Sequence, residues 1–414
     1  MKRILALSLA MLMSVSCLLI VQSCSIFEGE GNELQYIPLT KSEEGVRDVT
    51  TDFSLRLFDH VVTADSGKNV FISPLCMSML NAMLANGAKG DTYQEIVEAM
   101  GFVEPKMDEV NGYFSTMVSA LSKADKSVDF SLANSLWISR NFSAKSSFKS
   151  RLKSVYKADL YNVDFSKKAT VSQINKWCNS KTSGMIPELV GQLNDMTVMM
   201  LVDALYFKGE WQLKFKPENN EKGNFFRLDG MTSPVTFMQV KTATLKGYAD
   251  EEVRIVRMPY GNGAFYMEAI LPQTDDFMGF VHGLTLERLS GWAANNTEVI
   301  DLKFPKFKES YNTGMDILVA AMQAMGMKKA FTPSADFSGI SDNPVWVDAA
   351  LQKAAISVDE GGTEAAVAGL YKLRKANNVQ KDPKEIQMYF DRPFIYLIRE
   401  QSTGAILFMG AKVK

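Results

Sequence analysis

Residues 345–390, VWVDAALQKAAISVDEGGTEAAVAGLYKLRKANNVQKDPKEIQMYF, decide the fold of this chain. Residues 345–358 predict a long strand, and the chain turns apolar again at Phe390. The roughly 30 residues between these strands show no helix or strand period, so they are either a functional loop or disordered. Small apolar side chains at 363–369 favour a functional loop, because disordered segments are richer in charge.

The overall composition is that of an ordinary globular protein. The chain has 414 residues, of which 46% are hydrophobic, enough to build a large core. A net charge of −2 gives no basic field, so no nucleic-acid partner is expected. The basic residues of the loop are too local to change this expectation.

The N-terminus has the pattern of an export signal. Met1-Lys2-Arg3 is followed by the apolar residues 4–21, as in a secretory signal peptide. Residues 21–24, VQSC, resemble a bacterial lipobox, which would make Cys24 the lipidated first residue of the mature protein. The alternatives are Cys17, which is weaker because more apolar chain follows it, and an ordinary cleaved signal with an incidental cysteine.

These features predict three regions. Residues 1–23 are the lipoprotein signal peptide, 24–45 a flexible tether and 46–414 the folded domain. No other stretch reaches the roughly 18 apolar residues that span a membrane. We therefore expect an exported bacterial lipoprotein, anchored to a membrane and facing the periplasm or the cell surface.

Hydrophobic periodicity places helices mainly in the first half of the domain and strands in the second, which predicts one α+β domain. Ser73-Pro74 opens a central helix, and Thr92 with Glu95 predicts a capping box for a helix through Met100. Unbroken apolar residues predict a central strand buried on both faces at 198–207. Further expected elements are helices at 46–62, 75–86 and 315–325, strands at 69–72, 131–138 and 299–307, and a buried hairpin at 393–410.

The sequence contains little that supports catalysis. His60 and His282 are its two histidines, and neither accompanies a nucleophile motif. Cys76 and Cys178 lie in apolar helical patterns, so they are expected to be buried thiols. We therefore expect no enzyme activity, metal or cofactor.

A series of motifs now identifies a family. In chain order they resemble the segments of serpins, inhibitors of serine proteases, over the whole of residues 46–414. The matching segments are NVFISP (69–74), ANSLW (133–137), INKW (174–177), DALYFKGEW (203–211), MPY (258–260), LP (271–272), FPKF (304–307), GMKKAF (326–331), ADFSGI (335–340), EGGTEAAVA (360–368) and DRPF (391–394).

The resemblance implies three β-sheets, eight or nine helices and an exposed reactive-centre loop at about 360–384. A target protease cleaves the loop and forms an acyl-enzyme, and the loop then enters the central sheet as a strand and traps the protease. The resemblance thus implies a monomeric, irreversible suicide-substrate inhibitor of serine, and also of cysteine, endopeptidases. A non-inhibitory serpin that serves as a binding or structural surface protein is the alternative.

The hinge of the loop favours inhibition. It begins at Glu360 and Gly362, and an inserted strand would turn every second side chain into the core. The inward row carries no charge or bulky group, whereas non-inhibitory members often have such residues or proline in the hinge. The inward row is Thr363, Ala365, Val367 and Gly369, and the outward row is Glu364, Ala366 and Ala368.

Departures from the family pattern cluster where the sheet must open. The sheet-opening region consists of Ser73, Cys76, Asp203, Gln352 and Trp211. Serine, asparagine and histidine are common in the family where this chain has Cys76, Asp203 and Gln352. An Asp203–Gln352 hydrogen bond is expected to replace the family's asparagine–histidine contact.

The scissile bond has two equal candidates. The family's spacing from the hinge acid assigns Ala376 as the residue read by the protease, giving Ala376–Asn377 and an elastase-like target. A shift by one residue gives Lys375–Ala376 and a trypsin-like target, and Arg374–Lys375 ranks third.

Replacing the proposed lipid acceptor tests the location. Cys24→Ala should release the protein from the membrane fraction of its native host, because no acyl chain could be attached. Fractionation followed by immunoblotting measures this. Finding the unmutated protein in the supernatant would show that the anchor does not exist.

Overall fold

The computed structural model describes residues 33–103, 105–193, 196–293, 297–363 and 384–414. The chain divides into residues 1–33 and a compact body, Leu34–Lys414, to which the elements below belong. The signal peptide and Cys24 lie outside the described residues. Within the described part, no helix is both long and apolar enough to cross a membrane.

Helices form much of the N-terminal half of the body, as expected, and the first begins earlier than predicted. The side chain of Thr40 caps α2 together with Glu43, and Ile37 is already buried, so the fold begins before the predicted boundary at residue 46. The α-helices of the described residues are α2 Lys41–Ala64, α3 Pro74–Ala85, α4 Gly90–Met100, α5 Met107–Ala120, α6 Ser146–Val155, α7 Lys168–Lys181, α8 Phe277–His282, α9 Leu286–Ala293 and α10 Gly314–Ala324. Short 3₁₀ turns occupy Leu121–Lys123, Pro217–Asn219 and Lys329–Phe331.

The predicted capping box in α4 is wrong. The helix begins after Lys89, so Thr92 is inside it and its Oγ1 accepts a hydrogen bond of 2.8 Å from the Asp336 amide. Glu95 accepts from the backbone amides of Lys328 and Lys329. Both side chains therefore hold α4 to the segment after α10.

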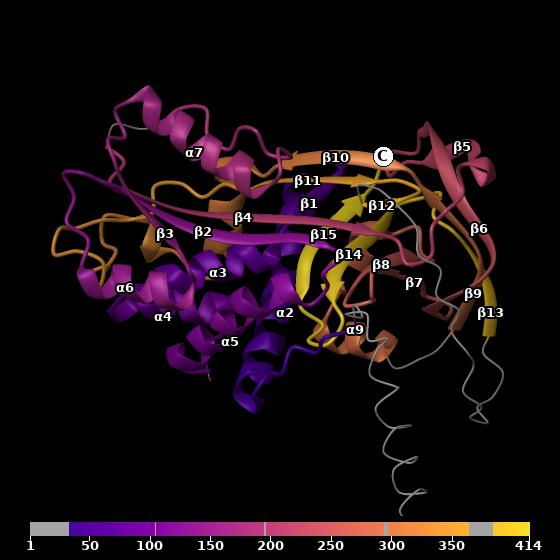
Figure 1. Ribbon diagram of the computed structural model, residues 1–414, viewed down its shortest axis with the longest axis horizontal. Coiled ribbons are helices and arrows are strands. Elements are labelled where there is room, and N and C mark those ends of the chain that lie inside the picture. Colours follow the sequence, from indigo (N-terminus) through magenta and orange to yellow (C-terminus); the bar gives the residue numbers. More distant parts are fainter. Residues whose placement is uncertain (1–32, 104, 194–195, 294–296, 364–383) are drawn as a thin grey trace, which may run out of the picture. The chain divides into compact units, whose positions relative to one another are not determined.

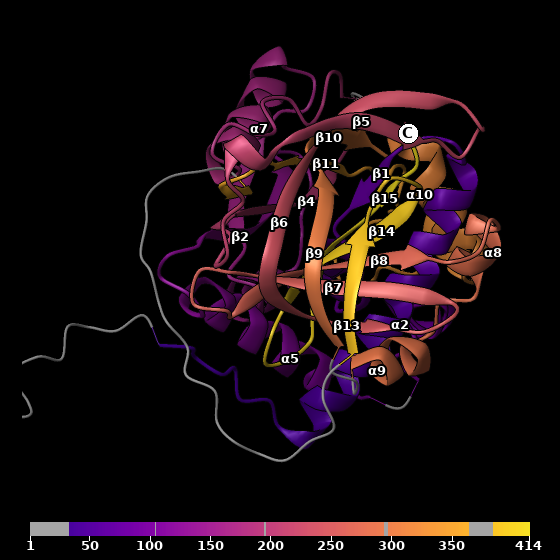
Figure 2. The same ribbon diagram turned by 90° about the vertical axis from the view of Figure 1, so that its right-hand side faces the viewer.

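Strands of the described residues form three sheets. The nine-stranded sheet has the order β1-β15-β14-β8-β7-β6-β9-β13, with β5 on β6, and Figure 2 shows β6, β9 and β13 side by side. Its strands are β1 Val70–Ile72, β5 Glu221–Phe226, β6 Thr232–Ala249, β7 Val253–Tyr260, β8 Phe265–Pro272, β9 Thr297–Pro305, β13 Lys384–Tyr389, β14 Phe394–Glu400 and β15 Ile406–Lys412. A four-stranded sheet, β12-β4-β2-β3, and a two-stranded sheet, β10-β11, complete the set. Their strands are β2 Asp129–Ser139, β3 Asp159–Val163, β4 Met199–Glu210, β10 Phe307–Asn312, β11 Lys353–Val358 and β12 Gly362–Thr363.

The four-stranded sheet lies between two apolar layers. Leu205 and Phe207 of β4 face the main core with α3, whereas Val202 and Ala204 face the smaller cluster formed with α7. Figure 1 shows α7 on one side of β2 and β4 and α3, α4, α5 and α6 on the other. The expected buried free thiols are confirmed, because Cys76 and Cys178 are buried and unpaired.

The strand predicted at 345–358 is shorter than expected, because only Lys353–Val358 forms β11. Its antiparallel partner β10 ends at Asn312. The next residue, Thr313, ends the pairing of β10 with β11. The Thr313 amide donates to the Gln352 carbonyl, and Thr313 Oγ1 accepts from the Gln352 amide. Residues before Gln352 therefore have no strand of this sheet beside them. The predicted C-terminal hairpin is confirmed as the buried pair β14 and β15.

Candidate functional site

A slot separates β4 from β11. The two strands belong to different sheets, and no ladder joins them in the described residues. After β11 the chain turns at Asp359–Gly362 and runs back beside β4 as β12, where Gly362 pairs with Glu210 and Thr363 with Gly209. The first residues of the predicted loop therefore already lie in strand geometry at one end of the slot.

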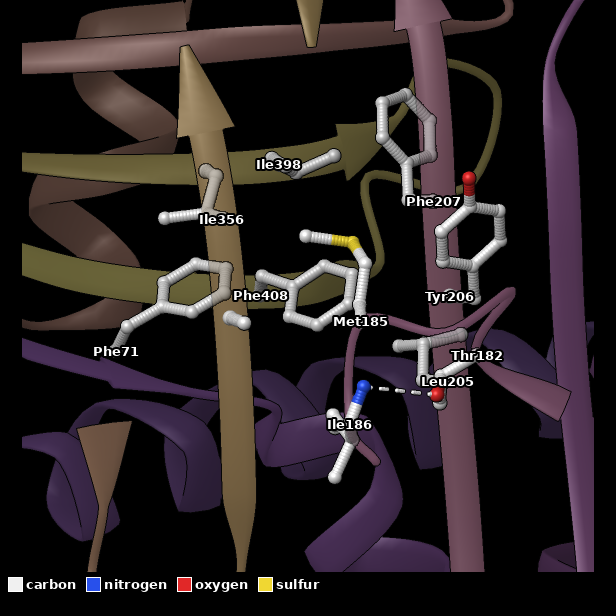
Figure 3. Close-up of a pocket in the computed structure, with 11 residues that line it drawn as sticks. Phe71, Thr182, Met185, Ile186, Leu205, Tyr206, Phe207, Ile356, Ile398 and Phe408 are labelled. Carbon is white, nitrogen blue, oxygen red and sulfur yellow. Dashed lines mark hydrogen bonds between the residues drawn. The ribbon is translucent and has the colours of Figure 1, made fainter. Parts of the chain in front are cut away.

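The slot is lined mainly by apolar side chains, and Met185 and Ile186 lie between its two strands. Figure 3 shows Met185, from the turn after α7, between Ile356 of β11 and Tyr206 of β4. Phe71 and Phe408 line the slot as well. The predicted central strand, β4, has apolar clusters on both faces as expected, and its edge beyond β12 faces this slot.

The hinge acid is fixed by two side chains. The carboxylate of Glu360 accepts hydrogen bonds from Lys306 Nζ at 2.8 Å and from Asn220 Nδ2 at 2.6 Å. Burial alone would raise the pKa of Glu360, but these two donors hold it below its usual value. The backbone carbonyl of Glu360 also accepts from the Phe215 amide at 3.2 Å. These contacts hold the start of the loop against the body.

Gly362 cannot be replaced without moving the backbone. Its φ is +142°, and a Cβ there would lie 2.3 Å from the carbonyl oxygen of Gly209. Trp211 contacts the same turn. Its Nε1 donates a hydrogen bond to the Asp359 carbonyl at 2.8 Å, and its ring stacks on Tyr260. The predicted hinge residues Glu360 and Gly362 and the predicted Trp211 thus lie together.

The expected Asp203–Gln352 hydrogen bond is not formed. Gln352 Oε1 accepts a hydrogen bond from the Ser73 backbone amide at 2.8 Å, and Gln352 Nε2 donates to the Ser73 carbonyl at 2.9 Å. The side-chain amide of Gln352 is therefore bound to the backbone of Ser73 and not to Asp203. Ser73 caps α3 as predicted, accepting from the Cys76 amide. Both carboxylate oxygens of Asp203 are buried without a hydrogen-bond partner, and burial raises the pKa of Asp203 well above its usual value.

The remaining predicted residues of the loop lie outside the described residues. These are the hinge residues Ala365, Ala366, Val367 and Ala368 and the candidates for the reactive bond, Arg374, Lys375, Ala376 and Asn377. In the described ranges, no cluster of three or more His, Cys, Asp or Glu side chains could hold a metal ion. His282 is half exposed and its Nδ1 lies 2.5 Å from Asp59 Oδ1, a surface pair rather than part of the slot.

Sequence reasoning missed three contributors to the site. Met185 lies in no motif, and Asn220 gives no sequence signal. Lys306 lies within the FPKF segment, which was used for recognition without assigning the lysine a role. Only the folded chain shows that Lys306 and Asn220 share one carboxylate.

Comparison with known proteins agrees with this geometry. The family model for the serpin (serine protease inhibitor) family matches residues 48–414. Serine protease inhibitor A6 of Xenopus laevis is 30% identical over 382 residues, covering 90% of this chain and 84% of that protein. The chain belongs to the serpin family, and the fold expected from the resemblance is confirmed.

Solved structures similar to this chain include a serpin in its native state and a serpin-fold protein in complex with thyroxine. The native state of tengpin, a thermophilic serpin, superposes with a TM-score of 0.79 and 29% identity, covering 93% of this chain and 97% of that one. Thyroxine-binding globulin in complex with thyroxine gives a TM-score of 0.78 and 27% identity, covering 89% and 99%. Family membership therefore leaves the type of activity to be argued from the slot and the hinge.

The contact between Gln352 and Ser73 can be tested by its effect on stability. Gln352→Leu should lower the free energy of unfolding by about 1–3 kcal/mol, because it leaves the amide of the buried Ser73 without an acceptor and removes one of the two donors to the Ser73 carbonyl, which keeps the Met77 amide. Denaturant unfolding measures this, with Gln401→Leu at an exposed turn as the matched control. An equal loss in both variants would contradict the assigned role.

Proposed function

We propose that this serpin is an irreversible suicide-substrate inhibitor of serine endopeptidases, with cysteine endopeptidases as a second target class. The observation that carries the proposal is the position of β12. Its two residues already pair antiparallel with β4 at one end of a slot that no strand fills in the described part of the sheet. A cleaved loop can extend this pairing along β4 and β11.

The chemistry consumes the inhibitor. The nucleophile of the protease attacks the scissile carbonyl, the peptide C–N bond breaks, and the amine leaves with a proton while the acyl group stays on the protease. The freed hinge then adds as a strand, gaining backbone hydrogen bonds on both of its edges. Insertion before water attacks the ester would carry the acylated protease along the body and distort its active site. The serpin itself turns over nothing, so it is not an enzyme.

The hinge composition supports insertion into this slot. The walls of the slot include the large side chains of Phe71, Tyr206 and Ile356, so small residues need the least separation of β4 and β11 to enter. Residues 363–369 are threonine, alanine, valine and glycine apart from Glu364. No bulky side chain would therefore have to enter the core.

A carrier role is the second candidate, because the structural relatives include thyroxine-binding globulin in complex with thyroxine. On this view the loop would be cut without trapping the protease. We further propose, from residues 1–24, that the mature protein is a lipid-anchored monomer at a bacterial membrane. That location would bring the loop to proteases outside the cytoplasm.

A charge in the hinge distinguishes inhibition from simple cleavage. The unmutated protein should form a covalent complex, stable in SDS, with a trypsin-like, elastase-like or papain-like protease. Thr363→Arg should be cleaved without forming that complex, because an unpaired charge would have to be buried during insertion. Thr232→Arg, at an exposed position of β6, is the matched control and should still form the complex.

Gel electrophoresis under denaturing conditions measures both outcomes. Cleavage of the unmutated protein by all three proteases without any complex would support the carrier role. An undiminished yield of complex from Thr363→Arg would show that the hinge does not enter the sheet.

The released fragment identifies the scissile bond and the target class. A C-terminal fragment that begins at Ala376 indicates a trypsin-like target reading Lys375, and one that begins at Asn377 indicates an elastase-like target reading Ala376. Mass spectrometry of the fragment from the covalent complex decides between them. A start outside residues 374–378 would show that the loop alignment is wrong.

A further inference from the structure

Asp203 lies opposite another unsatisfied acceptor. In the antiparallel register of β2 and β4, Asn134 is the direct partner of Asp203, so the two side chains project from the same face of the sheet. Neither oxygen of Asp203 nor Oδ1 of Asn134 has a hydrogen-bond partner, and all three atoms are buried. Asn134 Nδ2 donates to the Tyr156 carbonyl at 2.8 Å.

No rotation of the amide resolves this conflict. Turning Asn134 over would aim its Nδ2 at Asp203 but would place its oxygen against the Tyr156 carbonyl, exchanging one unsatisfied contact for another. An ionised carboxylate can only accept hydrogen bonds, so it leaves Oδ1 of Asn134 without a donor. A proton on Asp203 supplies the missing donor and removes the buried charge at the same time.

Among the residues that the structure describes, no charged group compensates Asp203. The elements packed most closely against β4 in the described part of the chain are α3, α7, β2 and β12. On the Asp203 face, α3 contributes the Cys76 thiol, and the Tyr156 hydroxyl follows α6. Burial raises the pKa of both groups, so both stay neutral. On the opposite face, burial likewise raises the pKa of Cys178 on α7, to about 11.

We propose that Asp203 is a neutral, protonated acid that donates a hydrogen bond to Asn134, and that loss of this proton favours opening of the slot. The first half stands on the geometry alone. The second half rests on the proposed inhibitory function, whose regulation it specifies. β4 borders the slot, so moving β4 away from β11 lets water reach an ionised Asp203. When the slot is closed, Asp203 stays shielded from water.

The direction of the pH effect follows from linkage. Burial raises the pKa of Asp203 far above its unfolded value of 3.8, so the folded state holds this proton more tightly than the unfolded state. Stability contributed by the group is therefore complete below the unfolded pKa and is lost as the pH rises toward the folded pKa. Acid preserves the closed, active form, and alkali shortens its lifetime.

Infrared spectroscopy tests the proton directly. At neutral pH the unmutated protein should show the carbonyl band of a protonated carboxylic acid, which Asp203→Asn should abolish. Asp129→Asn, at an exposed carboxylate of β2 in the same sheet, should leave the band unchanged. Asn134→Leu should shift the band to higher frequency, because the acid loses its acceptor. No band in the unmutated protein, or no shift in Asn134→Leu, overturns the assignment.

Lifetime measurements test the regulation. Between about pH 5 and pH 9 the melting temperature of the unmutated protein should fall more steeply than that of Asp203→Asn. Spontaneous loss of complex-forming activity should accelerate by up to about tenfold per pH unit, the limit for one proton. Parallel profiles in the two proteins overturn the regulatory role. The infrared and melting experiments need no target protease, so failure of the protein to inhibit would contradict the proposed function and leave the protonation result standing.

Discussion

The structure depends on keeping two strand edges apart. Backbone amides and carbonyls along a strand need partners, and an open edge readily accepts another strand. β4 and β11 nevertheless share no ladder in the described residues, although β12 shows that pairing on β4 is possible. The body therefore holds the two strands separately, as the proposed insertion of a third segment between them requires.

β4 and β11 are held in place by different contacts. β11 is tied to the start of α3 through Gln352 and Ser73, and the turn after it is held by Lys306 and Asn220 on Glu360. β4 instead pairs with β2 along its length and rests on α3 and α7. Both sides contact α3, but each has a ladder of its own, β10 for β11 and β2 for β4, so one side can move relative to the other without breaking that ladder.

Local patterns predicted the parts of this arrangement that local chemistry determines. The hairpin β14–β15 and the helix α3 follow from apolar runs and a Ser-Pro start, and the hinge follows from a rare run of small residues. The partner of Gln352 could not be predicted in this way, because Ser73 is 279 positions away in the chain. Asp203 was noticed only as a departure from the family, and its opposition to Asn134 required the strand register. The loss of strand at 345–352 depends on where β10 ends, which no local pattern encodes.

The position of Met185 affects how fast loop insertion can be relative to hydrolysis of the acyl bond in the proposed mechanism. Its side chain lies between β4 and β11, so in the proposed mechanism an inserting loop would have to displace it while water attacks the acyl bond to the protease. An unbranched thioether is flexible and can leave a gap with little strain. In that mechanism, the ease with which Met185 leaves the slot would set the ratio between trapped proteases and loops cut without trapping, and hence the number of serpin molecules consumed for each protease inhibited.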